Sequence, residues 1–298
     1  MLRAFFVIFT VALSFAFPVA YAGEGSVSRP AFLTLHDPGR RVLVIAPHPD
    51  DETFAAGGVI QRAVKNHSAV RVVIVTNGSS FVRAAQLLTK KTKLDPADFL
   101  YLGRVRQKES LEALKILGVK RSQVSFLGYP DRALSGFWIQ AGGDGEKLAA
   151  DLWGLFEDFK PTDVYYPFAG DEHPDHRAVS TFVKYVLLSH PWPVREHQYL
   201  IHYQKNRWPP FSGLSRFVAL TPPSDLQKKG LIWEVFPLRQ EEIRRKALAI
   251  NKYPTQLRAV RGRYLTFIRT NELFVVPAPG CPVNIPGPRF SAGCREKI

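Results

Sequence analysis

The chain has 298 residues, of which 46% are hydrophobic and 22% are charged, so it can bury a sizeable core and is not an intrinsically disordered protein. Its formal net charge of +14 favours an anionic partner, such as a membrane surface or a polyanionic glycan, although scattered positive residues also fit a merely solvated surface. No nucleic-acid-binding motif accompanies this charge, so nucleic acid is not an expected partner.

Residues 1–22 have the pattern of a signal peptide. A short positive start, "MLR", precedes the apolar stretch "AFFVIFTVALSFAF", and "AYA" before Gly23 forms a small-residue cleavage site. We therefore expect an exported protein, in a bacterial periplasm or secreted, that begins at Gly23. The alternative is an uncleaved membrane anchor, because the apolar stretch is nearly long enough to span a bilayer.

Apolar runs of strand length then alternate with segments of helical period. Strands are expected at 41–46, 70–77, 123–129 and 163–168, and helices at 54–67, within 98–119, at 145–160 and at 174–189. Beyond residue 190 the pattern weakens, with strands expected at 197–204, 215–220 and 271–276 and a helix at 238–253. Continuous apolar strands between helices predict an α/β fold with a parallel sheet buried on both faces. No linker divides residues 41–276, which we expect to form one domain after a lead-in at 23–40.

The tail at 277–298 is rich in Pro and Gly and contains Cys281 and Cys294. Two cysteines that close a short loop in an exported protein favour a disulfide over a metal pair. We expect this disulfide to fasten a tail that has no core of its own.

Two similar motifs follow two of the expected strands. "HPDDE" (48–52) follows the strand at 41–46, and "HPDH" (173–176) lies just beyond the strand at 163–168. The carboxyl ends of parallel strands share one edge of a sheet, where open α/β sheets bind their ligands. Each motif leads into a helix, with Pro in the first turn and the first and fourth side chains on the same side.

These motifs predict a catalytic metal site. Two imidazoles and a carboxylate, from His48, Asp51 and His176, would leave an open position on zinc, with Fe²⁺ or another divalent transition metal as the alternative ion. Asp50 would then serve as the general base for an attacking water. His173 would stabilise the oxyanion or protonate the departing amine.

Other interpretations of the motifs remain open. Each could be a capped helix start without a metal, or His48 and Asp50 with a distant histidine could form the His-x-Asp…His triad of non-haem Fe(II) oxygenases. That triad is expected on an all-β fold and would leave Asp51 without a role. Asp175 could orient a histidine through its second ring nitrogen.

"APHPDDE" with the later "HPDH" resembles the PIG-L/LmbE family of metal-dependent de-N-acetylases. The resemblance extends over roughly residues 40–276 through Arg106-x-x-Glu109, "LGYPD" ending at Asp131, "KALAINKYPTQL" and "NELF". It implies a Rossmann-like fold and the metal and catalytic roles given above. Some members place an aromatic residue two positions before the second motif, where this chain has Asp171.

The resemblance also implies the substrate, an N-acetylglucosamine-type amino sugar on a glycan or glycolipid. We therefore expect an exported zinc-dependent N-deacetylase, with a non-catalytic glycan-binding protein as the alternative. Arg106 and Asp131 are expected to contact the substrate, although Arg106 could instead form a helix-surface ion pair with Glu109. Four tryptophans in or beside loops are expected to pack, with stacking on sugars as the alternative: Trp138, Trp192, Trp208 and Trp233.

Overall fold

The computed structural model describes residues 31–32, 39–137, 143–205, 207–210 and 215–277. Within them the strands form an eight-stranded sheet, in the order β1-β7-β8-β6-β5-β2-β3-β4. The strands are β1 (Ala31–Phe32), β2 (Arg41–Ala46), β3 (Ala69–Thr76), β4 (Val124–Tyr129), β5 (Asp163–Pro167), β6 (Arg195–Tyr199), β7 (Ile232–Pro237) and β8 (Asn271–Val276). Neighbouring strands are parallel except where β8 pairs with β6 and β7. The expected α/β fold with a mostly parallel sheet is confirmed.

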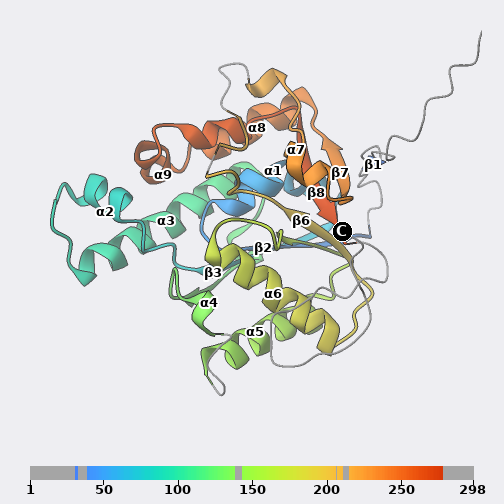
Figure 1. Ribbon diagram of the computed structural model, residues 1–298, viewed down its shortest axis with the longest axis horizontal. Helices are drawn as coiled ribbons and strands as arrows, with labels where there is room; N and C mark the ends of the chain where they lie inside the picture. The colour runs from blue at the N-terminus through green and yellow to red at the C-terminus, as the bar shows by residue number, and fades with distance from the viewer. Residues whose placement is uncertain (1–30, 33–38, 138–142, 206, 211–214, 278–298) are drawn as a thin grey trace, which may run out of the picture.

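Helices cover both faces of this sheet (Figure 1). On one side lie α1 (Asp51–Lys65), α3 (Pro96–Ile116) and α8 (Gln240–Ile250), and on the other α4 (Leu134–Phe137), α5 (Asp144–Phe159) and α6 (Pro174–Ser189). The remaining helices are α2 (Val82–Thr89), α7 (Ser224–Gln227), α9 (Pro254–Ala259) and 3₁₀ turns at Arg121–Gln123, Ser215–Phe217 and Arg263–Phe267.

Strand β2 is apolar from Val42 to Ala46 because both of its faces are buried. Val42, Val44 and Ala46 point into the core beneath α1 and α8, whereas Leu43 and Ile45 point into the core formed with α5 and α6. All five side chains are fully buried. A strand with helices on both faces has no solvent side, so the alternation of apolar and polar residues disappears.

Local sequence patterns locate most elements but not all. The strands at 41–46 and 271–276 and the helix at 174–189 have the predicted bounds. The predicted strand at 215–220 is wrong, because Ser215–Phe217 forms a 3₁₀ turn and Phe217 and Val218 are exposed. Strand β7 was not predicted, and it pairs along its whole length with β8.

Several expectations concern residues outside the described ranges. They are the signal peptide at 1–22, most of the lead-in, Trp138, and the pair Cys281 and Cys294. Among the described helices, none has both the length and the apolar character needed to cross a bilayer.

Candidate metal centre and catalytic site

The two histidine motifs meet at one edge of the sheet. Strands β2 and β5 are hydrogen-bonded neighbours and run parallel, so the loops at their carboxyl ends lie side by side. The loop after β2 contains His48 and leads into α1, whose first residue is Asp51. The loop after β5 leads into α6, with His173 as its N-cap and His176 in its first turn. Pro174 is the first residue of α6, where the missing N–H costs nothing, whereas Pro49 lies before the N-cap Asp50 of α1.

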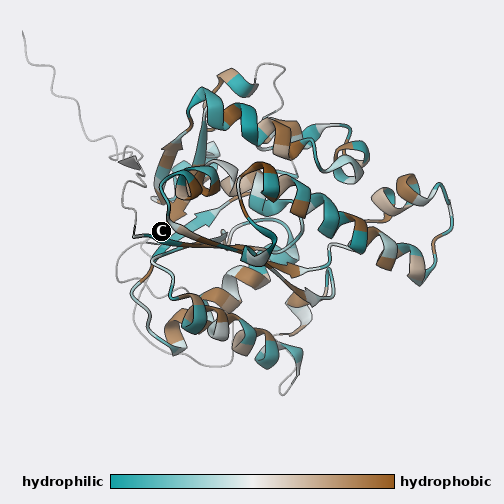
Figure 2. Ribbon diagram, turned by 180° about the vertical axis from the view of Figure 1, so that it is seen from behind, coloured by the Kyte–Doolittle hydropathy of each residue, from teal (hydrophilic) through white to brown (hydrophobic). Residues whose placement is uncertain are grey.

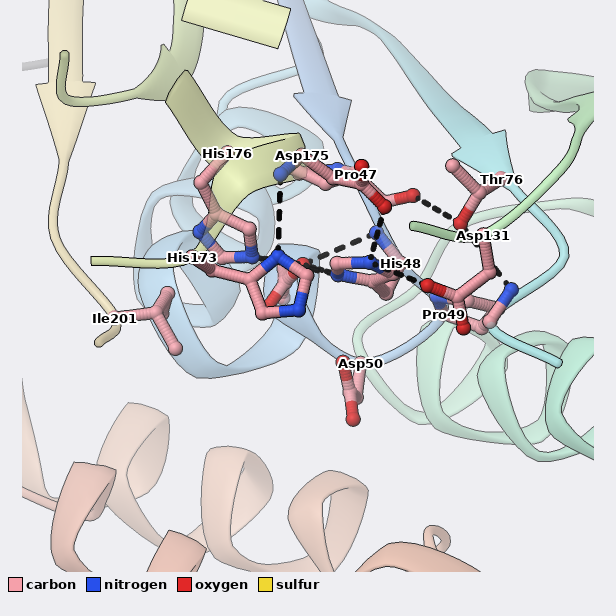
Figure 3. A network of polar contacts seen from close by, with 12 residues as sticks. Pro47, His48, Pro49, Asp50, Thr76, Asp131, His173, Asp175, His176 and Ile201 are labelled. Carbon is pink, nitrogen blue, oxygen red and sulfur yellow. Dashed lines mark hydrogen bonds and ion pairs between the residues drawn. The ribbon is translucent and has the colours of Figure 1, made fainter. Parts of the chain in front are cut away.

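His48, Asp51 and His176 form a tight triangle of potential ligand atoms. His48 Nδ1 lies 3.2 Å from Asp51 Oδ2, and His176 Nε2 lies 3.3 Å from His48 Nδ1 and 3.1 Å from Asp51 Oδ2. All three residues are buried. Figure 3 shows His48 between His176 on one side and Asp131 on the other.

This triangle fits a tetrahedral divalent ion. Bonds of about 2.0–2.2 Å to nitrogen and oxygen place neighbouring tetrahedral ligand atoms roughly 3.3–3.5 Å apart. The observed separations of 3.1–3.3 Å need little adjustment to reach that spacing. Asp50, which an oxygenase-type triad would require, makes a different contact, described below.

Carboxylates hold the far side of His48. Its Nε2 lies 3.3 Å from Asp131 Oδ1 and 3.3 Å from Asp175 Oδ2. Burial alone would lower the pKa of His48, but contacts with Asp131, Asp175 and Asp51 raise it well above its usual value. Asp131, predicted to contact substrate, thus lies beside His48, and its other oxygen accepts the Ser80 backbone N–H at 2.8 Å. Such carboxylates fix the ring orientation of a metal-binding histidine.

Asp171 does the same for His176 and was not identified from the sequence. Its Oδ2 lies 3.2 Å from His176 Nδ1 and accepts the backbone N–H groups of Ile201 at 2.9 Å and His202 at 3.0 Å. Its Oδ1 accepts the backbone N–H of His173 at 2.8 Å. Burial would raise the pKa of Asp171, but the charge of His176 and these contacts hold it at about 2. Burial would likewise lower the pKa of His176, but Asp171 and Asp51 raise it to about 9.

Asp50 pairs with a buried arginine. Its backbone has φ 150° and ψ −33°, a conformation that is strained for a residue with a side chain. Asp50 Oδ2 accepts from Arg106 Nη2 at 3.0 Å, and Arg106 also donates to the carbonyls of Gly78 at 2.5 Å and Pro49 at 3.2 Å. Burial and the charge of Asp51 raise the pKa of Asp50 to about 8, whereas Arg106 opposes the shift.

The alternative surface ion pair between Arg106 and Glu109 is wrong. Both side chains are buried, and Glu109 accepts instead from the backbone N–H of Thr255 at 3.0 Å and from its hydroxyl. The i, i+3 pairing of charges applies to exposed helix faces, whereas α3 packs against α1 and α8. Arg106 therefore supports the loop that contains Asp50.

Glu52 fixes the same loop from within the core. It is fully buried, and its Oε2 accepts the backbone N–H of Asp50 at 2.9 Å. Its Oε1 accepts the hydroxyls of Ser110 at 2.6 Å and Tyr253 at 2.7 Å. Glu52 and Arg106 thus hold opposite sides of Asp50 in place.

A cavity of about 530 Å³ opens beside the triangle. Its lining residues are Arg132, Ser135, Glu172, His173, Pro174 and His202. His173 Nδ1 accepts the backbone N–H of Asp175 at 3.3 Å, which leaves the ring proton on Nε2. Burial and the charges of His48, His176 and His202 lower the pKa of His173 to about 2, so its ring is neutral.

His202 is a second residue that sequence reasoning missed. Potential ligand atoms of Asp51, His176 and His202 lie within 4.8 Å of one another. The strand predicted at 197–204 would have enclosed His202, but β6 ends at Tyr199 and places His202 in the loop at the site. A prediction that β6 ends at Tyr199 would have identified His202, because β2, β5 and β6 are parallel neighbours whose following loops meet at one edge of the sheet.

The described tryptophans pack rather than line the cavity. Trp208 and Trp233 are buried, and Trp192 donates its indole N–H to the carbonyl of Pro161 at 2.9 Å. The expectation that these residues pack agrees with these positions.

Residues 43–187 match the model of the PIG-L family, described as GlcNAc-PI de-N-acetylase. They are a PIG-L domain. The site residues of both motifs lie within this match, and the supporting residues of α8, α9 and β8 lie beyond it.

Curated relatives of this chain include two deacetylases of amino-sugar compounds. The 1D-myo-inositol 2-acetamido-2-deoxy-alpha-D-glucopyranoside deacetylase of Mycobacterium sp. (strain KMS) is 34% identical over 152 residues, covering 46% of this chain and 46% of the relative. The probable N-acetyl-alpha-D-glucosaminyl L-malate deacetylase 2 of Bacillus cereus is 27% identical over 170 residues, covering 56% of this chain and 70% of the relative. The match thus spans less than half of the mycobacterial relative.

Solved structures extend the likeness in fold. The zinc-inhibited form of teicoplanin deacetylase Orf2 aligns with a TM-score of 0.58 at 18% identity, covering 81% of this chain and 100% of that chain. The A40926 pseudoaglycone deacetylase Dbv21 aligns with a TM-score of 0.57 at 20% identity, covering 80% and 97%. The chain therefore shares the Rossmann-like fold of these deacetylases well beyond the PIG-L domain at residues 43–187.

Proposed function

We propose that this chain is a metal-dependent deacetylase that removes the N-acetyl group from an N-acetylglucosamine-type amino sugar. The carrying observation is the triangle of His48, Asp51 and His176, whose spacing fits a tetrahedral ion. The PIG-L match and the names of the curated relatives support the substrate class.

A zinc ion held by His48, Asp51 and His176 would supply Lewis-acid chemistry that polarises the acetamide carbonyl. Asp50 accepts a proton from the attacking water and later returns it, and because burial raises its pKa its carboxylate is a stronger base than an exposed one. Arg106 and Glu52 keep its carboxylate and backbone in place during the reaction.

His173 acts on the other side of the reacting carbonyl. Because its Nδ1 accepts a backbone N–H, its Nε2–H is available to donate to the developing oxyanion. The adjoining cavity of about 530 Å³ is large enough for an amino sugar. The products are acetate and the free amine of the sugar.

The decisive experiment measures bound metal and acetate release on the same preparations. Elemental analysis of the wild type, Asp50→Ala and Asp51→Ala is expected to show zinc lost only with Asp51→Ala. Asp50→Ala is expected to retain zinc and to lose about 10²–10⁴-fold in acetate release from N-acetylglucosaminides. Asp144→Ala, at an exposed position of α5, is the matched control and should change neither quantity.

Acetate release that survives both metal removal and Asp50→Ala contradicts the proposal. Iron that is lost with Asp50→Ala instead would assign the site to an oxygenase-type triad. Unchanged glycan binding in Asp50→Ala, without acetate release at any metal loading, would assign the chain to a non-catalytic glycan-binding protein.

We also propose that the chain is exported after removal of residues 1–22 and that Cys281 and Cys294 form a disulfide. Mass spectrometry of the protein expressed with its own N-terminus should find Gly23 as the first residue. A thiol titration of the same protein should find no free cysteine. An intact N-terminus in a membrane fraction would instead identify an uncleaved anchor.

A further inference from the structure

The α2–α3 arm, residues 82–104, stands apart from the rest of the fold. It leaves the sheet after the carboxyl end of β3 and projects from the body of the molecule (Figures 1 and 2). Ala84, Ala85 and Leu102 form a small apolar cluster there with Ala259 of α9, separate from the two clusters that cover the sheet. The arm is therefore a folded outgrowth with its own inner packing.

Large apolar side chains nevertheless remain on the outside of the arm. Val82 is 50% exposed, Leu87 46%, Leu100 59% and Tyr101 45%. Four of the ten large hydrophobic residues that are exposed in the described part of the chain thus fall within 20 consecutive positions. Isolated exposed residues of this kind are ordinary, but a concentration of them marks an interaction surface.

Basic residues occur in the same stretch of chain as these apolar residues. Arg83, Lys90, Lys91, Lys93 and Arg104 are all exposed, while Asp95 is the exposed acid of the arm and Asp98 is buried. In the described structure the ion pairs of the arm engage Lys91, which lies 3.2 Å from Asp95 and 2.7 Å from Asp98. The arm therefore carries a net positive charge in the same 23 residues that expose its apolar side chains.

The base of the arm belongs to the catalytic edge. Between β3 and α2, the carbonyl of Gly78 accepts from Arg106, which pairs with Asp50. The backbone N–H of Ser80 donates to Asp131, which lies beside His48. A surface that binds the arm would consequently lie close to the opening of the site.

We propose that the α2–α3 arm docks this protein on an anionic lipid surface. Exposed Leu and Val side chains require an apolar phase, which a polyanionic glycan does not offer, and Tyr is favoured at the boundary of a bilayer. Lysines and arginines are attracted to anionic headgroups, which strengthens binding roughly fivefold for each residue. A second copy of this chain is a poorer occupant, because a chain of net charge +14 repels a positive arm.

The first test measures binding of the full chain to vesicles of phosphatidylcholine with and without phosphatidylglycerol. The variant Arg83→Glu/Lys90→Glu/Lys93→Glu is compared with Lys228→Glu/Lys229→Glu/Arg244→Glu, which changes net charge equally at exposed positions elsewhere. We expect the arm variant to bind the anionic vesicles at least about 100-fold more weakly than this control. Equal losses in the two variants would overturn the proposal.

The second test examines the apolar side chains. The apolar residues 1–22 are the same in both variants compared, so they do not affect the difference between them. Leu87→Ser/Leu100→Ser should weaken binding more than Leu188→Ser/Leu248→Ser, whose leucines are 54% and 59% exposed. Hydrogen exchange of the peptide 82–101 should slow when anionic vesicles are added. Unchanged hydrogen exchange of the arm in vesicle-bound protein overturns the proposal. Exchange that slows with rising protein concentration in the absence of vesicles also overturns it, because a second copy of the chain would then be the partner.

Docking would bring the site to lipid-linked amino sugars, and this use of the arm rests on the proposed deacetylase function. The two proposals fail separately, because vesicle binding is measured without any substrate. Acetate release from a soluble N-acetylglucosaminide should be unchanged in Leu87→Ser/Leu100→Ser, while release from a lipid-linked substrate in anionic vesicles should fall.

Discussion

The buried ion pair of Lys246 and Glu272 should make the fold sensitive to the loss of either partner. Lys246 Nζ lies 2.5 Å from Glu272 Oε1, and both side chains are 1% exposed. Glu272 also accepts the backbone N–H groups of Gly58 at 2.6 Å and Val59 at 2.9 Å, just after the irregular residue Ala56 of α1. The carboxylate therefore cannot move to another partner without abandoning the N–H groups of α1.

Replacing Lys246 by Met keeps the aliphatic stem, which packs near Gly57, and removes only the charge. Glu272 is then left as a buried carboxylate without its cation, a change that costs about 3–5 kcal/mol. Urea denaturation should show this loss in the free energy of unfolding, with a fall in Tm of roughly 6–15 °C.

Lys65→Met is the matched control, because Lys65 pairs with Glu241 at 3.7 Å where the side chains are 58% and 65% exposed. This substitution should cost less than about 1 kcal/mol. A loss below 1 kcal/mol for Lys246→Met, or equal losses for the two variants, would refute the reasoning that burial makes the first pair critical.

Two further predictions concern hydrogen-bonded groups elsewhere in the core. Burial lowers the pKa of His197, but Asp163 at 3.4 Å and Glu234 at 2.8 Å raise it above its usual value. The protonated His197 therefore stabilises the folded state fully below pH ~6.5, and this contribution is lost as the pH rises through the higher folded-state pKa. His197→Gln should flatten this part of the curve of unfolding free energy against pH, and an unchanged curve would contradict the role given to His197. Tyr253→Phe removes the 2.7 Å hydrogen bond from the Tyr253 hydroxyl to the buried Glu52 and should lower the free energy of unfolding by about 1.5–3 kcal/mol. It should also lower kcat more than it changes KM, and unchanged kinetics would show that Glu52 does not hold the catalytic loop.

Sequence patterns revealed the parts of this protein that depend on local order. The strand at 41–46 was readable because both its faces are buried, and the two histidine motifs were readable because parallel strands direct their ends to one edge. The structure brings His48, Asp51 and His176 within 3.1–3.3 Å of one another, and their role as metal ligands stays a prediction.

Residues that act across long sequence separations were not readable in the same way. His202 reaches the site only because β6 lies beside β5, an arrangement that no local pattern encodes. Arg106 reaches Asp50 because one face of α3 is buried, whereas its sequence equally suits an exposed helix. Strand β7 depends on its antiparallel pairing with β8, near the end of the described chain.

The position of β8 determines which part of this chain can work alone. Residues 43–187 contain both histidine motifs, yet α1 depends on Glu272 of β8, and Glu52 depends on Tyr253 between α8 and α9. A fragment that ends at residue 187 would leave the first half of α1 with buried polar groups and no partners for them. We therefore expect that an engineered transplant of the site must include the carboxyl-terminal third of the stretch from β2 to β8, residues 41–276.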